Sequence, residues 1–128
     1  MPSIQKTIAS SLCFSCLFFA GASLAQKAWV VGQSAPLSGS NAAFGRDIRD
    51  GAAAYFKAVN AKGGVGGLPI EFVTLDDKND RKQAGTNTQQ LLETHGAAAL
   101  FGFASATLSL DAMPQAEPGG VHAACVVW

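Results

Sequence analysis

The sequence predicts an α/β fold built on a doubly wound parallel sheet. Three short apolar runs typical of buried strands alternate with segments whose apolar residues recur at helical spacing. Parallel strands need a long connection, and that crossover is almost always right-handed, so helices are expected on the sheet faces. The chain shows no internal repeat and no linker long enough to divide the part after residue 25 into two domains.

Residues 1–25 have the pattern of a cleavable signal peptide. Lys6 precedes an apolar stretch over residues 8–20, and Ser23-Leu24-Ala25 supplies the small residues that a signal peptidase requires. The apolar stretch is too short to cross about 30 Å of hydrocarbon comfortably, which argues against a membrane anchor. We expect cleavage after Ala25 and export of a mature chain that begins at residue 26.

Cysteine content and charge exclude two classes of protein. Neither Cys13 nor Cys16 lies in a lipobox, and cleavage would remove both, so Cys125 alone would remain and no internal disulfide is expected. Nine Lys and Arg residues balance nine Asp and Glu residues and are scattered among them. Nucleic-acid binding needs clustered cations, so we expect no nucleic-acid partner.

The first strand is expected over residues 28–32, and a loop rich in Pro and Ser follows over residues 34–40. After Gly45 a helix that packs on the sheet is predicted from a stripe formed by Ile48, Ala52, Tyr55, Phe56 and Val59. Lys62 and Gly63 are expected to end it, because a cation complements the helix dipole and glycine adopts the left-handed cap conformation.

The second strand is expected over residues 68–75, closed by Asp76-Asp77. Asp80 and Gln83 form a D-x-x-Q arrangement in which each side chain can satisfy a backbone donor at the start of the second helix. The predicted buried stripe of that helix consists of Ala84, Thr88, Leu91 and Leu92. His95 and Gly96 are expected to end it.

The third strand is expected over residues 97–103, which are apolar almost throughout. Ser105 then begins a further helical segment, whose predicted apolar residues are Leu108, Ala112 and Met113. Pro114 is expected to kink this segment.

Ligands of open parallel sheets bind beyond the carboxyl ends of strands, where neighbouring connections diverge to opposite faces. This rule selects residues 34–45, residues 76–80 and residues 102–107. The last segment is the most informative, because Ser105 and Thr107 offer hydroxyls where a helix begins, and a helix start favours an anion such as a carboxylate. The simpler interpretation makes Ser105 an ordinary N-cap, worth about 1 kcal/mol.

Other motifs favour structural roles. The glycine-rich residues 63–67 lie between a helix and the next strand, at the amino end of the sheet, and lack the order of a nucleotide loop. Asp76-Asp77 is favoured as a turn, since adjacent strand residues point to opposite faces. His95 suits a helix end, and His122 lies in an atypical tail. With no nucleophile elbow, H-E-x-x-H or C-x-x-C in the mature chain, we expect no catalytic residue, metal or cofactor.

Several ordered motifs between residues 28 and 117 resemble those of the leucine/isoleucine/valine-binding protein family. They are residues 31–39, Phe44-Gly45, Gly51-Ala52, residues 60–65, Asp76-Asp77 and Gln83-Ala84. The resemblance implies a type I periplasmic binding protein with two Rossmann-like lobes. Such a protein closes on an amino acid or similar small molecule and presents it to an ABC permease in the inner membrane, without performing chemistry.

The resemblance also implies which residues touch the ligand. Ser105 and Thr107 match the serine- and threonine-containing turn that holds the ligand carboxylate, with Ala104 contributing a backbone contact. Phe44 matches a position where the family often has an aromatic residue, which would cover the apolar part of the ligand. The implied location is the periplasm.

The resemblance covers only part of such a protein, and residues 26–128 correspond to a partial N-terminal lobe. Residues 118–128 depart from the strand that relatives show, and we hypothesise a frameshift or premature stop, which resequencing would refute by finding an intact reading frame. Two alternatives stay open: a periplasmic receptor of the same fold that senses amino acids or amides, and a secreted α/β enzyme.

Overall fold

Four parallel strands and three helices make up the computed structural model, which describes residues 27–119 and 122–124. The elements are β1 (Trp29–Ala35), α1 (Ala42–Ala61), β2 (Ile70–Asp76), α2 (Arg81–Glu93), β3 (Ala99–Phe101), α3 (Ala106–Ala116), a 3₁₀ turn (Glu117–Gly119) and β4 (His122–Ala124). The predicted signal peptide lies outside the described residues.

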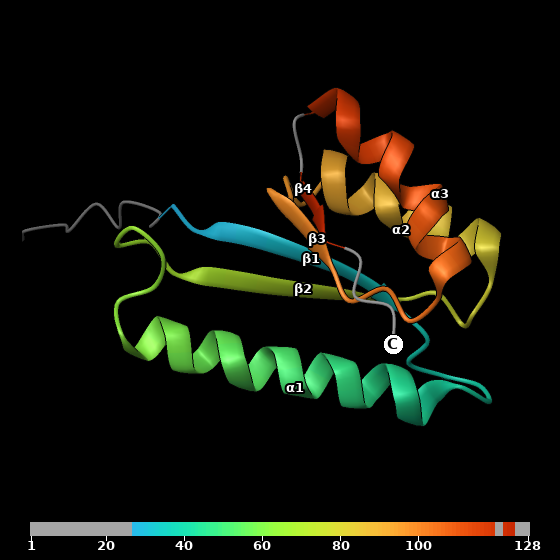
Figure 1. The fold of residues 1–128 in the computed structure, drawn as a ribbon, viewed down its shortest axis with the longest axis horizontal. Helices are drawn as coiled ribbons and strands as arrows, with labels where there is room; N and C mark the ends of the chain where they lie inside the picture. The colour runs from blue at the N-terminus through green and yellow to red at the C-terminus, as the bar shows by residue number, and fades with distance from the viewer. Residues whose placement is uncertain (1–26, 120–121, 125–128) are drawn as a thin grey trace, which may run out of the picture.

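The strands are ordered β2-β1-β3-β4, and every neighbouring pair is parallel. In Figure 1, α1 covers one face of the sheet, while α2 and α3 lie together on the opposite face. The chain therefore leaves β1 toward one side of the sheet and leaves β3 toward the other. The predicted doubly wound α/β fold is confirmed.

Strand β1 is longer than predicted, because it continues past Gly32 through Ala35. Its last three residues pair with the end of β2 in register with Thr74, Leu75 and Asp76. The prediction that Ser34 begins a loop was wrong. Gln33 and Ser34 are fully buried in this central strand. Their polar side chains are tolerated there because both are hydrogen-bonded.

The other two predicted strands differ from the structure at their ends. Strand β2 starts at Ile70 rather than at residue 68, because Leu68 folds back on Val65 in a tight turn. Strand β3 comprises only Ala99–Phe101, although apolar residues flank it on both sides. Gly102 ends β3 by adopting a φ of +70°, a left-handed conformation that continues no strand.

Helix α1 begins at Ala42, one turn earlier than predicted. Its packing on the sheet depends on Phe56, whose ring contacts Phe72 of β2 and Phe101 of β3 edge to face, with centroids 5.1 and 6.1 Å away. Tyr55 is 67% exposed, so its assignment to the buried stripe was wrong. Lys62 caps the helix and Gly63 follows with a φ of +100°, which confirms the predicted end.

The main core lies between the sheet and the α2/α3 layer. Its buried residues are Ala84, Leu91, Ala97, Leu100, Phe103, Leu108, Ala112 and Ala116. A methyl group added to Gly32 would lie 3.0 Å from Leu91 Cδ2, so this glycine lets α2 sit close to β1. The predicted stripe of α2 is confirmed, whereas Met113 of α3 is 38% exposed and lies outside the core.

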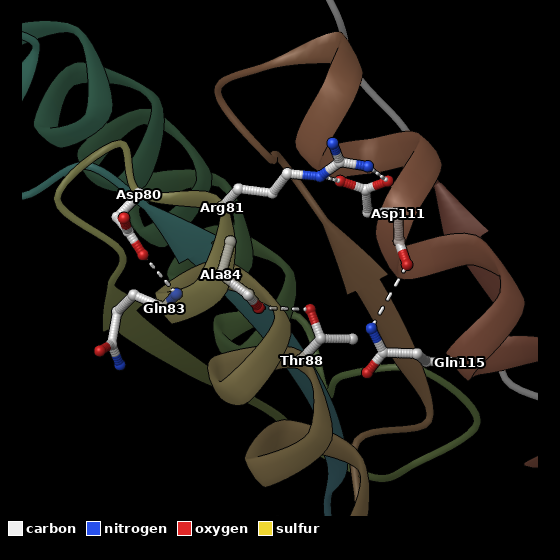
Figure 2. A network of polar contacts seen from close by, with 7 residues as sticks. All are labelled: Asp80, Arg81, Gln83, Ala84, Thr88, Asp111 and Gln115. Carbon is white, nitrogen blue, oxygen red and sulfur yellow. Dashed lines mark hydrogen bonds and ion pairs between the residues drawn. The ribbon is translucent and has the colours of Figure 1, made fainter.

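Polar contacts fix the start of α2 and join it to α3 (Figure 2). Asp80 Oδ1 accepts from the Gln83 amide at 2.7 Å, which confirms half of the predicted capping arrangement. The other half was wrong, because the Gln83 side chain donates to Asn87 instead of reaching back to the cap. Arg81 pairs with Asp111 of α3 through two hydrogen bonds.

The glycine-rich turn at residues 63–67 lies at the amino end of the sheet, as predicted. Val65 O accepts from the indole of Trp29 at the start of β1, at 3.1 Å, and the Trp29 amide donates to Pro69 O. An apolar pocket of about 340 Å³ opens beside this turn, lined by Trp29, Val30, Val31, Val65, Ile70, Ala98 and Ala99. No helix among the described residues has the length and hydropathy to span a membrane.

Candidate ligand-binding site

The carboxyl ends of β1 and β3 form the point at which the strand order reverses. These strands are direct neighbours, but the connection from β1 runs to α1 on one face and the connection from β3 runs to α3 on the other (Figure 1). Crevices of this kind are where open α/β sheets bind ligands. The loops after β1 and β3 are therefore the candidate site.

The turn between β3 and α3 consists of residues 102–105, which we call the β3–α3 turn. Ser105 has extended backbone angles of −152° and 132°, and its carbonyl accepts hydrogen bonds from the amide and the hydroxyl of Ser109, both at 2.9 Å. Ser105 thus occupies the N-cap position of α3. Within the part of the chain that the structure describes, its hydroxyl makes no capping hydrogen bond with the helix. The interpretation of Ser105 as the N-cap residue of α3 is therefore confirmed, but its side chain does not make the hydrogen bond that such a cap usually supplies.

The residues that the sequence singled out come from the β3–α3 turn, from α3 and from α1. Ala104 and Ser105 are half-buried, and Thr107 is exposed in the first turn of α3. Phe44 lies in the first turn of α1 and is 47% exposed. Ile48, one helical turn further along the same face, approaches Gly102: a methyl group added there would lie 3.2 Å from Ile48 Cγ2. The contacts of these residues with a ligand stay a prediction.

Asp76, the last residue of β2, holds the loop that follows β1. One carboxylate oxygen accepts from the amides of Leu37 and Lys78, both at 2.9 Å, and the other accepts from the Ser38 hydroxyl at 2.6 Å. Partial burial alone would raise the pKa of Asp76, but these hydrogen bonds to the charged form outweigh burial and lower its pKa. Asp76 is therefore an anionic anchor for the β1–α1 loop.

Asp77 points away from that loop. It is fully buried, accepts from the Ser34 hydroxyl at 3.0 Å and the Asn79 amide at 2.8 Å, and lies near Asn87, which donates to Ser34. Burial raises the pKa of Asp77, and the hydrogen bonds from Asn79 and Ser34 only partly counter it. The two aspartates therefore do not share a site. Their role in the turn agrees with the prediction, and the described residues contain no cluster suited to a metal ion.

Gln33 and Asn87 contribute to this edge of the sheet but were not recognised from the sequence. Gln33 lies in β1 and spans from Thr74 of β2 to the β3–α3 turn. Asn87 lies in α2 and donates to the backbone of Asp76. One feature of the sequence could have indicated Gln33. Positions 33 and 74 carry polar residues, and they are partners in the parallel pair formed by β1 and β2.

Comparison with known proteins identifies the family. A family model described as "Periplasmic binding protein" matches residues 28–124. The chain belongs to the periplasmic binding protein family. The match includes all the described strands and helices, and the predicted resemblance to leucine/isoleucine/valine-binding proteins is confirmed.

Three relatives illustrate the family match. An "Amino acid binding protein" from Pseudomonas aeruginosa is 31% identical over 94 residues, which are 73% of this chain and 25% of that protein. Among solved structures, the branched-chain amino acid transporter substrate binding protein LivJ from Streptococcus pneumoniae, in complex with isoleucine, has a TM-score of 0.69 and 30% identity, over 77% of this chain and 30% of that one. A solute binding protein of an ABC transporter from R. palustris, in complex with benzoate, has a TM-score of 0.67 and 28% identity, over 79% of this chain and 27% of that one.

The comparisons also define the extent of the similarity. This chain spans less than a third of the length of each of these relatives. What it shares with them is the parallel sheet with its switch point and its covering helices. The chain is thus related to the binding proteins of branched-chain amino acid ABC transporters over one portion of their length.

Proposed function

We propose that the chain belongs to the substrate-binding component of an ABC importer, located in the periplasm, and that its β3–α3 turn receives the carboxylate of an amino acid or related small molecule. It would present this ligand to a permease in the inner membrane and perform no chemistry. The observation that carries the proposal is the Ser105 hydroxyl, which lies at the strand switch point and is not used as a cap for α3.

The physical chemistry of the turn suits a carboxylate. The first amides of α3 have no acceptor within the helix, and the helix dipole favours negative charge at this end. The hydroxyls of Ser105 and Thr107 add two donors, and the backbone at Ala104 approaches without a bulky side chain. Isoleucine and benzoate, the molecules bound in two relatives, differ in shape and charge but share a carboxylate. A site that recognises this shared group is consistent with both.

Phe44 would supply an apolar surface for the ligand, since it lies one helical turn from Ile48, which approaches Gly102. Its ring is 47% exposed at the start of α1, which borders the crevice from the other face of the sheet. Covering such a ring with the apolar part of a ligand is favourable by roughly 25 cal/mol for each Å² removed from water. We therefore assign Phe44 to the ligand side chain and the β3–α3 turn to the ligand carboxylate.

Titration of the ¹⁵N-labelled chain with isoleucine and with benzoate at millimolar concentration tests this assignment. We expect the amide resonances of residues 104–107 to shift with both ligands and to stay unchanged with isoleucinamide and benzamide, which lack the carboxylate. Ser105→Ala should weaken the response, whereas Thr86→Ala, at an exposed position of α2, should leave it intact. Equal shifts with the acids and the amides would contradict a carboxylate site.

The transport role requires a separate test. Permease genes next to the coding sequence would support import, whereas a histidine kinase or transcription regulator in that place would support sensing. Fractionation of cells by osmotic shock tests the location, since a periplasmic protein is released with the shock fluid and a cytoplasmic one stays in the cells.

A further inference from the structure

Gln33 lies directly beneath the β3–α3 turn and connects three strands. Its side chain is fully buried, its Nε2 donates to Gly102 O at 2.8 Å, and its Oε1 accepts from Thr74 Oγ1 at 3.2 Å. The carboxamide therefore bonds to β2 on one side and to the first residue of the β3–α3 turn on the other. A buried amide that is satisfied at both ends has one defined orientation.

Gly102 is held in place by the same side chain. Its φ of +70° is accessible to glycine at little cost, and a methyl group added to it would lie only 2.8 Å from Gln33 Nε2. The carboxamide thus occupies the space that a side chain at position 102 would need. Gly102 is the first residue of the turn and lies two positions before Ala104, so the direction of its carbonyl affects the path of the turn toward Ala104 and Ser105.

We propose that Gln33 is a positioning residue that holds the β3–α3 turn in its binding geometry through the carbonyl of Gly102. The ligand in this proposal is the one given by the proposed function, so that part rests on the proposed function. The expectation that Gln33 keeps the turn ordered does not depend on it. Without this donor the Gly102 carbonyl loses its buried partner, and the part of the turn that is not anchored by the buried Phe103 is held less firmly. Gln33 contacts no ligand in this scheme and acts only through the turn.

Gln33→Met tests the proposal, since methionine keeps the approximate size and removes the donor. Thr74→Val is the matched control, because it removes the hydrogen bond at the opposite end of the same carboxamide and leaves Nε2 free to donate to Gly102. Both variants should lower the stability of the chain to urea. Only Gln33→Met should also reduce the ¹⁵N order parameters of residues 103–105 from values near 0.85 to below 0.6.

Binding provides the second measurement. For isoleucine or benzoate we expect about tenfold weaker affinity in Gln33→Met and a change of less than about twofold in Thr74→Val, where tenfold corresponds to about 1.4 kcal/mol. Equal loosening of the turn in both variants, or a rigid turn in Gln33→Met, would overturn the proposal. If the turn loosens as expected but neither ligand shifts any wild-type amide, the carboxylate site fails and the positioning role stands.

The wild-type chain offers a measurement that does not depend on folding of a variant. The side-chain amide protons of Gln33 should exchange with solvent at least tenfold more slowly than those of Gln90, which is exposed on α2. Exchange at the same rate as Gln90 would show that the carboxamide is not held against Gly102, and would overturn the proposal.

Discussion

Replacing Asp76 by alanine should release the β1–α1 loop from the sheet. The change removes the acceptor for three donors, of which the Leu37 amide is partly buried, whereas the Ser38 hydroxyl and the Lys78 amide are exposed. Exposed donors find water instead and contribute little, but a partly buried amide left without a partner costs about 1–3 kcal/mol. We therefore expect Asp76→Ala to lose about 2 kcal/mol, or roughly 8–16 °C in Tm for a domain of this size.

The pH dependence provides a specific test of this reasoning. The pKa of Asp76 is lowered in the folded chain, where its hydrogen bonds outweigh burial, whereas in the unfolded chain the carboxyl should titrate near about 3.9. The stabilisation by Asp76 is therefore fully present above about pH 4 and is lost as the pH falls through the lower folded pKa. Urea unfolding followed by circular dichroism should show a constant difference between wild type and Asp76→Ala from pH 7 to 5, shrinking below pH 4.

Asp77→Asn changes the neighbouring aspartate and serves as the comparison. Unlike Asp76→Ala, it should not lower the stability of the chain at pH 7. Burial raises the pKa of Asp77, so its negative charge opposes folding increasingly as the pH rises from the unfolded pKa through the higher folded pKa. An asparagine keeps an oxygen for the Asn79 amide and removes this charge, so the variant should be at least as stable as wild type at pH 7. Our reasoning would be refuted if Asp76→Ala and Asp77→Asn lost the same stability, or if the Asp76→Ala difference persisted unchanged at pH 3.

Three further predictions concern the helices. Gly45→Ala should destabilise the chain by about 1–3 kcal/mol in urea unfolding, because its methyl group would lie 2.0 Å from a carbonyl oxygen of the β1–α1 loop, whereas Gly51→Ala, with open space around it, should stabilise α1 by about 0.5–1 kcal/mol. Asp80→Ala should cost about 1 kcal/mol by removing the N-cap of α2, and Asp80→Asn should recover most of it. Arg81→Met should lower the Tm at low salt and have little effect at 1 M NaCl, because its contact with Asp111 is exposed to solvent; an effect independent of salt would contradict an ionic contact.

The fold class followed from the sequence because its strand and helix signals are separate and regular. Ala84, Thr88 and Leu91 were assigned to one helix face from their spacing, and all three are buried in α2. The N-cap of this helix is Asp80, as the D-x-x-Q pattern predicted. Tyr55 shows the limit of this approach. Spacing assigns a residue to a helix face, but the width of the buried stripe depends on the sheet beneath it. In the described part of α1, the aromatic contacts with β2 and β3 come from Phe56 and not from Tyr55.

Element ends and the polar groups of the site were harder to predict, since they depend on partners distant in the sequence. Gln33 pairs through its backbone with β2, and its polar side chain is tolerated there because Thr74 and Gly102, both more than forty positions further along, hydrogen-bond to it. Residues 97–103 are uniformly apolar, so composition alone could not indicate that Gly102 turns the chain after only three paired residues. The location of the candidate site at the strand switch point was predictable, but the absence of a cap bond from the Ser105 hydroxyl depends on the local conformation of the turn, which the sequence pattern does not specify.

The placement of β1 between β2 and β3 has a consequence for how the chain acquires its structure. Val31 pairs with Phe72 on one side and with Ala99 on the other, so β1, the first of the described strands, is enclosed on both edges only after β3 has been synthesised. Long-range pairing of this kind is slow, and an unpaired apolar strand is prone to associate with other chains while it waits. A chaperone that shields residues 29–35 would therefore protect the segment around which the whole sheet is later assembled.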